Sequence, residues 1–364
     1  MGIKMKNDFM ILSNMISSNQ IQEIIKRQGN PIENSFHKPL LLEYNQTIIG
    51  GLISLQILPE DCIHKAGIIL ARKQFLSALR YAVNKFDVKI VLLAASTKRL
   101  FGKVIELKVN WEGQLDESGF TLRELYPEIL FTNGDNGTAG ILNLEIDAIL
   151  QKTGINSNGN AVVINGLGLL GFDSLEYLLE QNINAEQIMI ISNHTKELKE
   201  LIVSKKIKIF PSIKSIEIKN SNKVRLIINC THHPSSLITY DNLKCIQNGQ
   251  SIHVIDVAVP YGFAEEELLK CSNVYRQDGG NAHLKTGLEF FFNPEFCGLT
   301  ENVLYGCFAE TIALSAYLKE SPNEIQTLRE YDFFNVNKKS KNFVKGLFEK
   351  YGMGAGDIPL NFMR

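Results

Sequence analysis

The sequence is poor in cysteine, in excess charge and in long apolar runs. Its 364 residues include six cysteines without regular spacing and without a Cys-x-x-Cys pair, which argues against a disulfide framework and a structural zinc site. The 38 basic and 39 acidic side chains leave a net charge of −1, so a protein that coats nucleic acid is not expected. The longest weakly polar stretch, Ala161–Phe172, is interrupted by Asn165 and is shorter than the roughly 20 residues that a membrane span needs.

The N-terminus carries no recognisable address signal. The apolar run Phe9–Leu12 is too short for the core of a signal peptide, and Lys6 stands where an N-myristoylation motif requires Ser or Thr. The adjacent His232 and His233 lack a third clear ligand, so we predict no metal site. We therefore expect a reduced, cytoplasmic protein without nucleic-acid partners or stable membrane insertion.

Apolar residues make up 45% of the chain and charged residues 21%, which is typical of a globular protein with a substantial core. At roughly 150 residues per domain, the length predicts two to three domains. Strand-like segments at 40–42, 48–58 and 88–93 alternate with a helix at 66–86, whose apolar residues recur mostly at spacings of three and four. We predict an N-terminal α/β domain over residues 1–135 that binds the substrate.

Residues 136–285 show a different rhythm. A helix at 138–152 leads to short apolar runs, each followed by loop residues, at 160–165, 188–191, 224–228 and 253–259. Repetition of strand, loop and helix in this way predicts an α/β fold with a Rossmann-type, doubly wound parallel sheet.

A glycine-rich loop, Gly166-Leu167-Gly168-Leu169-Leu170-Gly171, follows the first of these runs and opens a helix. In such a loop the first glycine permits a tight turn, the second lets a pyrophosphate approach the backbone, and the third allows close packing of helix on strand. The phosphates would meet the amide-rich N-terminus of the helix. We predict that this loop, with Gly166, Gly168, Leu169, Leu170 and Gly171, binds a dinucleotide; a glycine turn that binds nothing is the alternative.

The choice of dinucleotide depends on the residues after the second strand. A carboxylate there would bind the ribose 2′-hydroxyl of NAD, but the chain has Ser192, Asn193, His194 and Thr195, followed by Lys196. Hydroxyl groups, an amide and a nearby cation suit a 2′-phosphate better, so we predict NADPH. Cys230 and Thr231 follow a later strand, at the edge where such sheets hold their cofactor, and are candidates for lining the nicotinamide pocket.

Cys307 is the sharpest candidate for chemistry among the cysteines. It lies in a predicted helix over residues 302–319, with Thr300 as the N-cap, inside a helical C-terminal region that spans 286–364. Gly306 beside it would leave room for a substrate. From the spacing alone a core cysteine is the better explanation, because free cysteines are among the most buried residues.

Several short segments resemble those of one family. Cys307-Phe308-Ala309-Glu310 is similar to the C-terminal signature of the aldehyde-forming long-chain acyl-(acyl carrier protein) reductases. Further segments fit in the same order, so that the resemblance covers about residues 65–350 discontinuously. These segments are Ala71-Arg72-Lys73-Gln74-Phe75, the stretch Leu93–Phe101 with Ser96-Thr97, Gly134 with Thr138-Ala139, the glycine loop, Ile255-Asp256, and Gly279-Gly280 with His283.

The resemblance implies a reaction and roles for individual residues. Cys307 would be the nucleophile that takes the acyl group from a thioester, and NADPH would reduce the acyl-enzyme to an aldehyde. His283 would assist this step or face the oxyanion, with an ordinary loop histidine as the alternative, and Gly279 would contact the cofactor. The residues implied to bind the substrate are Ser96, Thr97, Thr138, Arg72 and Lys73.

The substrate carrier would be an acyl carrier protein or coenzyme A. An acyl carrier protein is acidic, so its docking surface should be basic. The strongest basic cluster comprises Arg72, Lys73, Arg80, Lys85, Lys98, Arg99 and Lys103, although a solvated charged face is the alternative. Oligomeric state is left open.

The chain also departs from the family pattern. The glycine loop has a different spacing, Ala94-Ala95 stands where Gly-Gly is usual, and the segment Asp135–Gly137 lacks a histidine. These departures put the acyl length and the carrier in doubt.

Two other functions fit the same layout. One is a two-domain oxidoreductase similar to shikimate dehydrogenase or glutamyl-tRNA reductase, because Thr132-Asn133-Gly134-Asp135 resembles a substrate-loop motif of that group. The other is a regulator that binds NADPH without catalysis.

Overall fold

The computed structural model describes residues 5–102, 105–153, 160–192, 207–216, 223–231, 233, 236–244, 246, 250–259, 261–285, 288–290 and 302–355. The chain divides into two compact units, Met1–Thr138 with Ala282–Gly354 and Ala139–Asn281 with Ala355–Arg364. The sequence predicts three consecutive segments instead, and most of the C-terminal one belongs to the first unit. In the part of the chain that the structure describes, no helix is long and apolar enough to cross a membrane.

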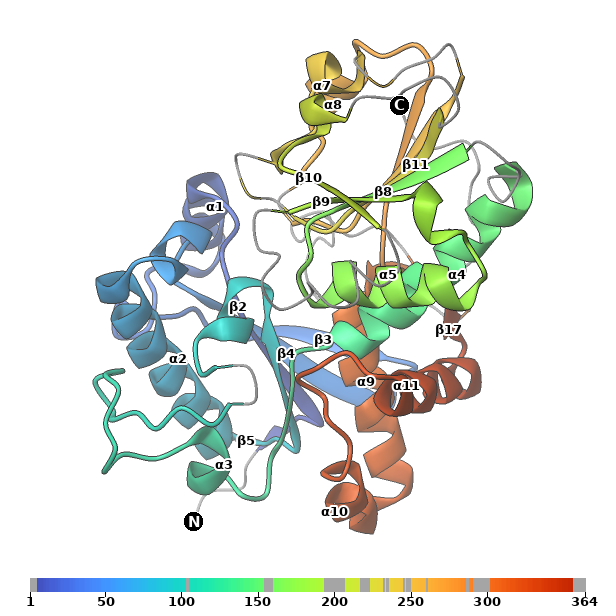
Figure 1. Ribbon diagram of the computed structural model, residues 1–364. Helices are drawn as coiled ribbons and strands as arrows, with labels where there is room; N and C mark the ends of the chain where they lie inside the picture. The colour runs from blue at the N-terminus through green and yellow to red at the C-terminus, as the bar shows by residue number, and fades with distance from the viewer. Residues whose placement is uncertain are drawn as a thin grey trace. The chain divides into compact units, whose positions relative to one another are not determined.

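The first unit is built on a mixed six-stranded sheet (Figure 1). Strands β2, β4, β6 and β7 run parallel, whereas β3 is antiparallel to β4 and β15 is antiparallel to β3. In spatial order the strands are β15 (Leu288–Phe290), β3 (Leu40–Tyr44), β4 (Ile48–Leu55), β2 (Phe9–Asn14), β6 (Ile90–Ala94) and β7 (Leu130–Thr132).

Helices cover both faces of this sheet. Helix α2 (Lys65–Lys85) buries Phe75 and Leu79, one turn apart, against one face. Helix α9 (Gly306–Glu320) contacts β2, β4 and β6 and also α11 (Lys338–Tyr351), so it is buried on nearly every side. Among its described residues, the unit also contains the helices α1 (Ser18–Gln28), α3 (Leu122–Leu125) and α10 (Ile325–Leu328).

Two small sheets complete the first unit. Strands β1 (Met5–Lys6) and β5 (Phe86–Asp87) pair in parallel. A three-stranded sheet has the order β16 (Val303–Tyr305), β14 (Asn281–Leu284) and β17 (Met353–Gly354).

The second unit contains a six-stranded sheet in which every neighbouring pair is parallel. The order is β10 (Lys208–Phe210), β9 (Ile188–Ile191), β8 (Asn160–Asn165), β11 (Lys223–Asn229), β12 (Ile252–Asp256) and β13 (Val274–Asp278). Numbered along the chain, this is the 3-2-1-4-5-6 order of a Rossmann-type sheet. The predicted fold class is therefore confirmed.

Alternating side chains on these strands divide the second unit into two cores. Val162 and Ile164 pack with residues of α4 (Asp135–Thr153) and α5 (Leu169–Glu180). Ala161 and Val163 point to the other face, which is covered by α7 (Tyr240–Lys244) and α8 (Glu265–Leu268). Such buried strands read as continuous apolar runs, which is why the sequence locates β8 and β9 at their observed bounds.

The C-terminal helix with Cys307 begins later than predicted. Residues 303–305 form β16 and the helix starts at Gly306, whereas the sequence predicts a helix from residue 302. Val303, Leu304 and Tyr305 have β-branched, apolar and aromatic side chains that suit a strand, and β14 offers a partner for it. Thr300, the predicted N-cap, lies outside the described residues. Cys307 consequently lies in the first turn of the helix rather than in its interior.

Candidate active site

Lys98 and Asp135 meet at one edge of the sheet in the first unit. Lys98 lies in the turn after β6 and Asp135 begins α4 shortly after β7. Since β6 and β7 are parallel neighbours, their carboxyl ends lie at the same edge. The Lys98 Nζ lies 2.5 Å from Asp135 Oδ1, and the two side chains are 22% and 9% exposed. The pair is thus a largely desolvated ion pair at the position where α/β sheets bind ligands.

The turn from β7 into α4 is fixed by its own side chains. The Thr132 hydroxyl accepts a hydrogen bond from the Gly134 amide at 2.9 Å, and the Asn133 side chain accepts one from the Asp135 amide at 3.0 Å. Gly134 has φ +72°, a left-handed conformation that other residues adopt at a cost. These local bonds set the direction in which Asp135 leaves the sheet.

A second segment, residues 332–335, holds this turn from outside. The Asn133 amide donates to the Phe333 carbonyl at 3.2 Å, and its side-chain amide donates to the Phe334 carbonyl at 2.9 Å. The Asn136 side chain donates to the carbonyls of Asp332 and Asn335 at 3.4 and 3.3 Å. The position of Asp135 therefore depends on a loop about two hundred residues further along the chain.

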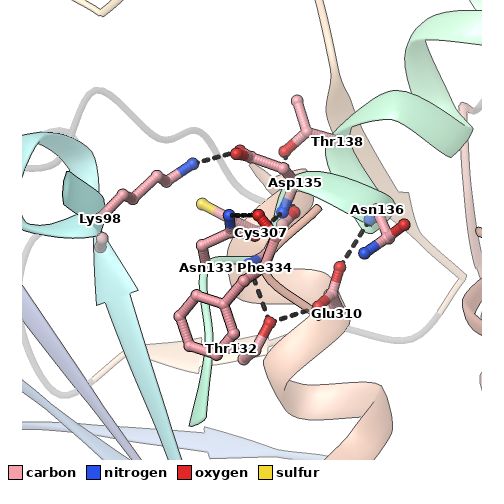
Figure 2. A network of polar contacts seen from close by, with 12 residues as sticks. Lys98, Thr132, Asn133, Asp135, Asn136, Thr138, Cys307, Glu310 and Phe334 are labelled. Atoms are coloured by element: carbon pink, nitrogen blue, oxygen red, sulfur yellow. Dashed lines mark hydrogen bonds and ion pairs between the residues drawn. The ribbon is translucent and has the colours of Figure 1, made fainter. Parts of the chain in front are cut away.

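Cys307 packs directly on the same turn. A Cβ atom placed on Gly134 would lie 2.2 Å from Cys307 Cβ, and one on Gly137 would lie 2.6 Å from the Gly306 carbonyl oxygen. Glycine at both positions lets the first turns of α4 and α9 approach each other. In Figure 2 the Cys307 side chain comes from α9 and its sulfur points to the side on which Lys98 lies.

Glu310 lies one turn after Cys307 in α9 and links this helix to the first turn of α4. Its carboxyl group is fully buried and accepts hydrogen bonds from the Thr132 hydroxyl at 2.5 Å and from the Gly137 amide at 2.6 Å. Figure 2 shows Glu310 and Cys307 projecting from the same helix towards the β7–α4 turn. Glu310 thus has a structural role, because it holds the first turn of α9 against the β7–α4 turn.

Three ionisable groups of this site, Lys98, Cys307 and Glu310, have shifted pKa values. Burial disfavours the charged form of Lys98, but Asp135 and Cys307 outweigh burial, so the pKa of Lys98 is raised. Burial raises the pKa of the Cys307 thiol to about 11; Lys98 opposes this rise and Asp135 adds to it. Burial also raises the pKa of Glu310 to about 7. The resting site at neutral pH therefore holds an ammonium group beside a neutral thiol.

The predicted substrate-binding residues near Lys98 form hydrogen bonds within the fold. Thr97 is fully buried, and its hydroxyl lies 2.7 Å from the Ala94 carbonyl oxygen, so it secures the turn that carries Lys98. The Ser96 amide donates to the Asn14 side chain at 2.8 Å. The Thr138 hydroxyl donates to the Gly134 carbonyl at 3.2 Å. Ser96 and Thr97 lie in the turn that carries Lys98, and Thr138 lies in the first turn of α4 with Asp135; direct contact with a substrate stays a prediction.

The basic residues of the predicted docking cluster differ in exposure and in their partners. Arg72 is 8% exposed, and its Nε donates to the Leu100 carbonyl at 2.5 Å, so this guanidinium supports the fold instead of facing a partner. Lys73 is exposed but paired with Glu112. Lys98 belongs to the ion pair with Asp135. Arg80, Lys85 and Arg99 remain exposed, whereas Lys103 lies outside the described residues.

His283 lies in strand β14, where it pairs in register with Gly354 of β17. It belongs to the first unit, as Cys307 does. Its assistance to Cys307 stays a prediction.

The glycine loop of the second unit has the geometry that dinucleotide binding requires. Gly166 has φ +94°, and a Cβ there would lie 2.8 Å from Thr231 Cβ. A Cβ on Gly171 would lie 1.9 Å from the Gly166 carbonyl oxygen, so α5 packs closely on the loop. Gly168, by contrast, has no atom within 4 Å of the corresponding position, and it caps the N-terminus of α5. The open side of Gly168 and the first-turn amides of α5 fit a pyrophosphate group.

Polar residues continue along the carboxyl edge of this sheet. Asn165 ends β8 and donates to Asn229 at the end of β11 at 2.7 Å, and Asn229 donates to Asp256 at the end of β12 at 2.7 Å. All three side chains are buried. Hydrogen bonding of buried polar groups to one another keeps this edge of the sheet ordered.

The other residues predicted to bind the cofactor lie at the start of α5, after β9 and after β13, or outside the described residues. Leu169 and Leu170 begin α5, and Leu169 is 41% exposed. Ser192 follows β9, and its amide donates to the Phe210 carbonyl at 3.2 Å. Gly279 packs against Ile255. Asn193, His194 and Thr195, on which the choice between NAD and NADPH depends, lie outside the described residues.

Cys230 and Thr231 follow β11 beside the glycine loop. The Cys230 amide donates to the Asn165 carbonyl at 2.8 Å, and Thr231 packs on Gly166. Burial, followed by the nearby Asp256, raises the pKa of the Cys230 thiol to about 12. Cys230 is therefore a poor nucleophile, and the contacts favour a supporting position next to the loop.

Sequence reasoning missed the ion pair. The sequence places Lys98 in the predicted docking cluster and Asp135 in a segment that resembles a substrate loop, and neither prediction pairs the two residues. A usable signal was present, because each residue follows a short apolar run and those runs become parallel neighbours. The pairing of the two strands decides that the side chains meet.

The fold and these sites define a two-unit α/β protein, one unit of which has a Rossmann-type sheet. No family model matches the chain, and no curated protein matches it. The acyl reductase resemblance therefore rests on the short sequence segments.

Some solved structures are similar over much of the chain. L-Tryptophan dehydrogenase from Nostoc punctiforme has a TM-score of 0.41 and 10% identity over 95% of this chain and 88% of that chain. A dipicolinate synthase component from Bacillus halodurans has a TM-score of 0.33 and 13% identity over 75% and 90%. A chorismate mutase/shikimate 5-dehydrogenase fusion protein from Clostridium acetobutylicum has a TM-score of 0.27 and 14% identity over 69% and 77%. At these scores and identities, the similarities define neither a family nor a reaction.

Proposed function

We propose that this chain is an oxidoreductase that uses a nicotinamide dinucleotide, with its chemistry at the site of Cys307, Lys98 and Asp135. The glycine loop supports the cofactor assignment through the left-handed turn at Gly166 and the open side of Gly168. NADPH is the proposed form. When bound, the reduced nicotinamide would supply a hydride to a carbonyl carbon.

The specific reaction we propose is reduction of an acyl thioester to an aldehyde. The observation that carries it is the convergence of three segments of the family resemblance. Residues 93–101, 134–139 and 307–310 are far apart in the sequence, and they meet through the Lys98–Asp135 pair, the Gly134–Cys307 contact and the Glu310 hydrogen bonds.

In this reaction the Cys307 thiol adds to the thioester carbonyl and the carrier thiol departs with the thiol proton, which leaves the acyl group on Cys307. Lys98 stabilises the negative charge that develops on the thiol and on the carbonyl oxygen. Lys98 would supply the proton to the carbonyl oxygen when the bound cofactor delivers its hydride, and collapse of the resulting hemithioacetal would release an aldehyde and return its proton to the Cys307 sulfur. Because the pKa of the resting thiol is about 11, we expect the acylation rate to increase with pH well above neutrality.

Intact mass spectrometry tests this reaction directly. The protein is incubated with an acyl-coenzyme A thioester or an acyl carrier protein thioester in the absence of NADPH. We expect an acyl adduct on the Cys307 peptide, its absence in Cys307→Ala, and its retention in the control Cys271→Ala, which alters a buried cysteine of the second unit. In a parallel assay with NADPH present, aldehyde formation by Cys307→Ala from either thioester would reject the reaction.

A second reaction is favoured by the Lys98–Asp135 pair itself. An ammonium group held by a carboxylate can donate a proton to the oxygen of a ketone, or to the nitrogen of an imine, as hydride is added to the carbon. Such a reaction needs no covalent bond between enzyme and substrate. In that case Lys98→Met would abolish turnover of a small 2-oxo or hydroxy acid, and Cys307→Ala would retain it. Cofactor binding without turnover of any substrate class would instead favour a regulator.

A further inference from the structure

A cavity lies in the first unit. Its volume is about 150 Å³. It lies among α3, β7 and α10, of which α3 and α10 are at the lower end of the unit in Figure 1. Neither Cys307, Lys98 nor Asp135 lines it. The lining residues are Arg123, Tyr126, Pro127, Ile129, Leu130, Phe131, Arg329, Tyr331, Phe333 and Phe334.

The lining combines aromatic rings with two guanidinium groups. Among the residues that the structure describes, neither Arg123 nor Arg329 forms an ion pair with a carboxylate, and the polar partner of Arg329 is the neutral Gln326 at 3.3 Å. Guanidinium groups bind carboxylates and phosphates through paired hydrogen bonds. Arg123 is exposed and Arg329 is half-buried, so both guanidinium groups are accessible to an anion that enters the cavity.

The size of the cavity limits the apolar part of such a ligand. A cavity of about 150 Å³ in another protein accommodates one benzene ring. We propose that this cavity binds a small anion in which a carboxylate or phosphate is attached to one aromatic ring or an equally short aliphatic chain. This ligand is distinct from the substrate of the proposed function, and the proposal does not depend on that function.

The cavity and the ion pair share the same stretches of backbone. Phe131 lines the cavity and immediately precedes Thr132, which binds Glu310. Phe333 and Phe334 line it as well, and their carbonyl groups hold Asn133, whose side chain accepts from the Asp135 amide. A ligand that moves these aromatic residues would move Asp135 and thereby Lys98. We infer that occupancy of the cavity alters the reactivity of Cys307.

Direct binding tests the first half of the proposal. Ligand-observed NMR is used to titrate the full chain with benzoate and phenyl phosphate, with benzyl alcohol as the neutral probe. We expect saturable binding of the two anions, with Arg123→Gln and Arg329→Gln each weakening it about tenfold, the loss expected for a charge-assisted hydrogen bond. Lys345→Gln, which removes an exposed cation of α11, should bind as the native chain does. Absence of binding, equal affinity for benzyl alcohol, or unchanged binding in both arginine variants would overturn the site.

The rate of Cys307 alkylation tests the second half. Iodoacetamide labelling of the Cys307 peptide is followed by mass spectrometry with and without saturating benzoate. We expect at least about a twofold change in rate that disappears in the Arg123→Gln/Arg329→Gln double variant, as a population shift of the site requires. A benzoate effect that persists in the double variant, or none in the native chain, would overturn the coupling. Neither the binding titration nor the alkylation rate depends on catalytic turnover. Both tests therefore remain valid if the proposed reaction is rejected.

Discussion

The two polar sites of this protein differ in how far apart their residues lie in the sequence. The glycine loop in the second unit occupies one turn between β8 and α5, from Gly166 to Gly171. In the first unit, Lys98 and Asp135 are 37 positions apart, and Thr132 and Glu310 are 178 apart. One site is therefore a local motif, whereas the other exists only after the sheet and the C-terminal helix have assembled.

The glycines show what the difference means physically. Gly166 and Gly171 make room for each other within one turn, and Gly168 leaves space for a ligand. Gly134 and Gly137 make room for another helix, α9, which carries Cys307. The same residue type thus serves a ligand in one unit and tertiary packing in the other.

The largest contrast is expected between Gly134→Ala and Gly168→Ala. Alanine at Gly134 combines φ +72° with a Cβ that would overlap Cys307, so we expect a loss of roughly 2–5 kcal/mol of stability. Alanine at Gly168 meets open space, so the stability should change by no more than about 1 kcal/mol, while NADPH binding weakens at least about tenfold. Urea unfolding and fluorescence titration measure the two effects. Equal effects of both substitutions on stability would contradict the distinction between packing and ligand glycines.

Removal of the Lys98 ammonium group should change stability and Cys307 reactivity in the first unit but leave cofactor binding by the second unit unchanged. Lys98→Met leaves Asp135 buried without its partner, which costs roughly 3 kcal/mol, and it should slow Cys307 alkylation because Lys98 lowers the pKa of that thiol. NADPH affinity should stay within about twofold of the native value. The matched control is Lys89→Met, since Lys89 and Asp87 form an exposed pair worth less than about 1 kcal/mol. Faster alkylation in Lys98→Met would contradict the assigned electrostatics.

Each unit contains a buried glutamate with a raised pKa, and the effects of the two glutamates on the pH dependence of stability can be compared. Burial raises the pKa of Glu310 in the first unit to about 7 and that of Glu145 in the second unit to about 8, from 4.5. Glu145 accepts from the Gly280 amide at 2.8 Å. Because the folded state retains each proton more strongly, stability should decrease as the pH increases from 4.5 to the raised pKa. At 1.36 kcal/mol for each pH unit, the losses are at most roughly 3 and 5 kcal/mol.

The corresponding glutamine variants should remove this pH dependence. Urea unfolding between pH 5 and 8.5 should show a flatter profile for Glu310→Gln and for Glu145→Gln than for the native chain, and the second should differ over the wider pH range. Glu117→Gln, at an exposed position, is the control and should follow the native profile. A profile as steep in a buried variant as in the native chain would show that this carboxyl group is already ionised in the folded state.

The smallest effect concerns the proposed carrier-docking surface. Lys85→Glu and Arg99→Glu reverse exposed charges, so we expect the KM for carrier-protein thioesters to increase about threefold and that for coenzyme A thioesters to stay unchanged. Arg72→Glu should lower stability instead, because its guanidinium is buried against the Leu100 carbonyl. Equal changes for both thioesters would reject docking at this face.

Local patterns were sufficient for much of the fold. Strands β8 and β9 have the predicted bounds, and α2 and α4 were located to within a few residues, because apolar runs and spacings of three and four report burial directly. The start of α9 was not predictable from such patterns. Residues 303–305 become a strand because β14 lies beside them, and no pattern within the helix reports that neighbour.

By itself, the sequence determined the parallel sheet of the second unit, its glycine loop and the selection of Cys307 as a candidate. Those features show as local patterns, each confined to one strand, turn or helix, and the sheet follows from the repetition of such patterns along the chain. The tertiary structure decided that Lys98 pairs with Asp135, that Arg72 is buried and that Cys307 begins a helix. Each of these depends on which strands and helices become neighbours, and burial and charge act through that proximity.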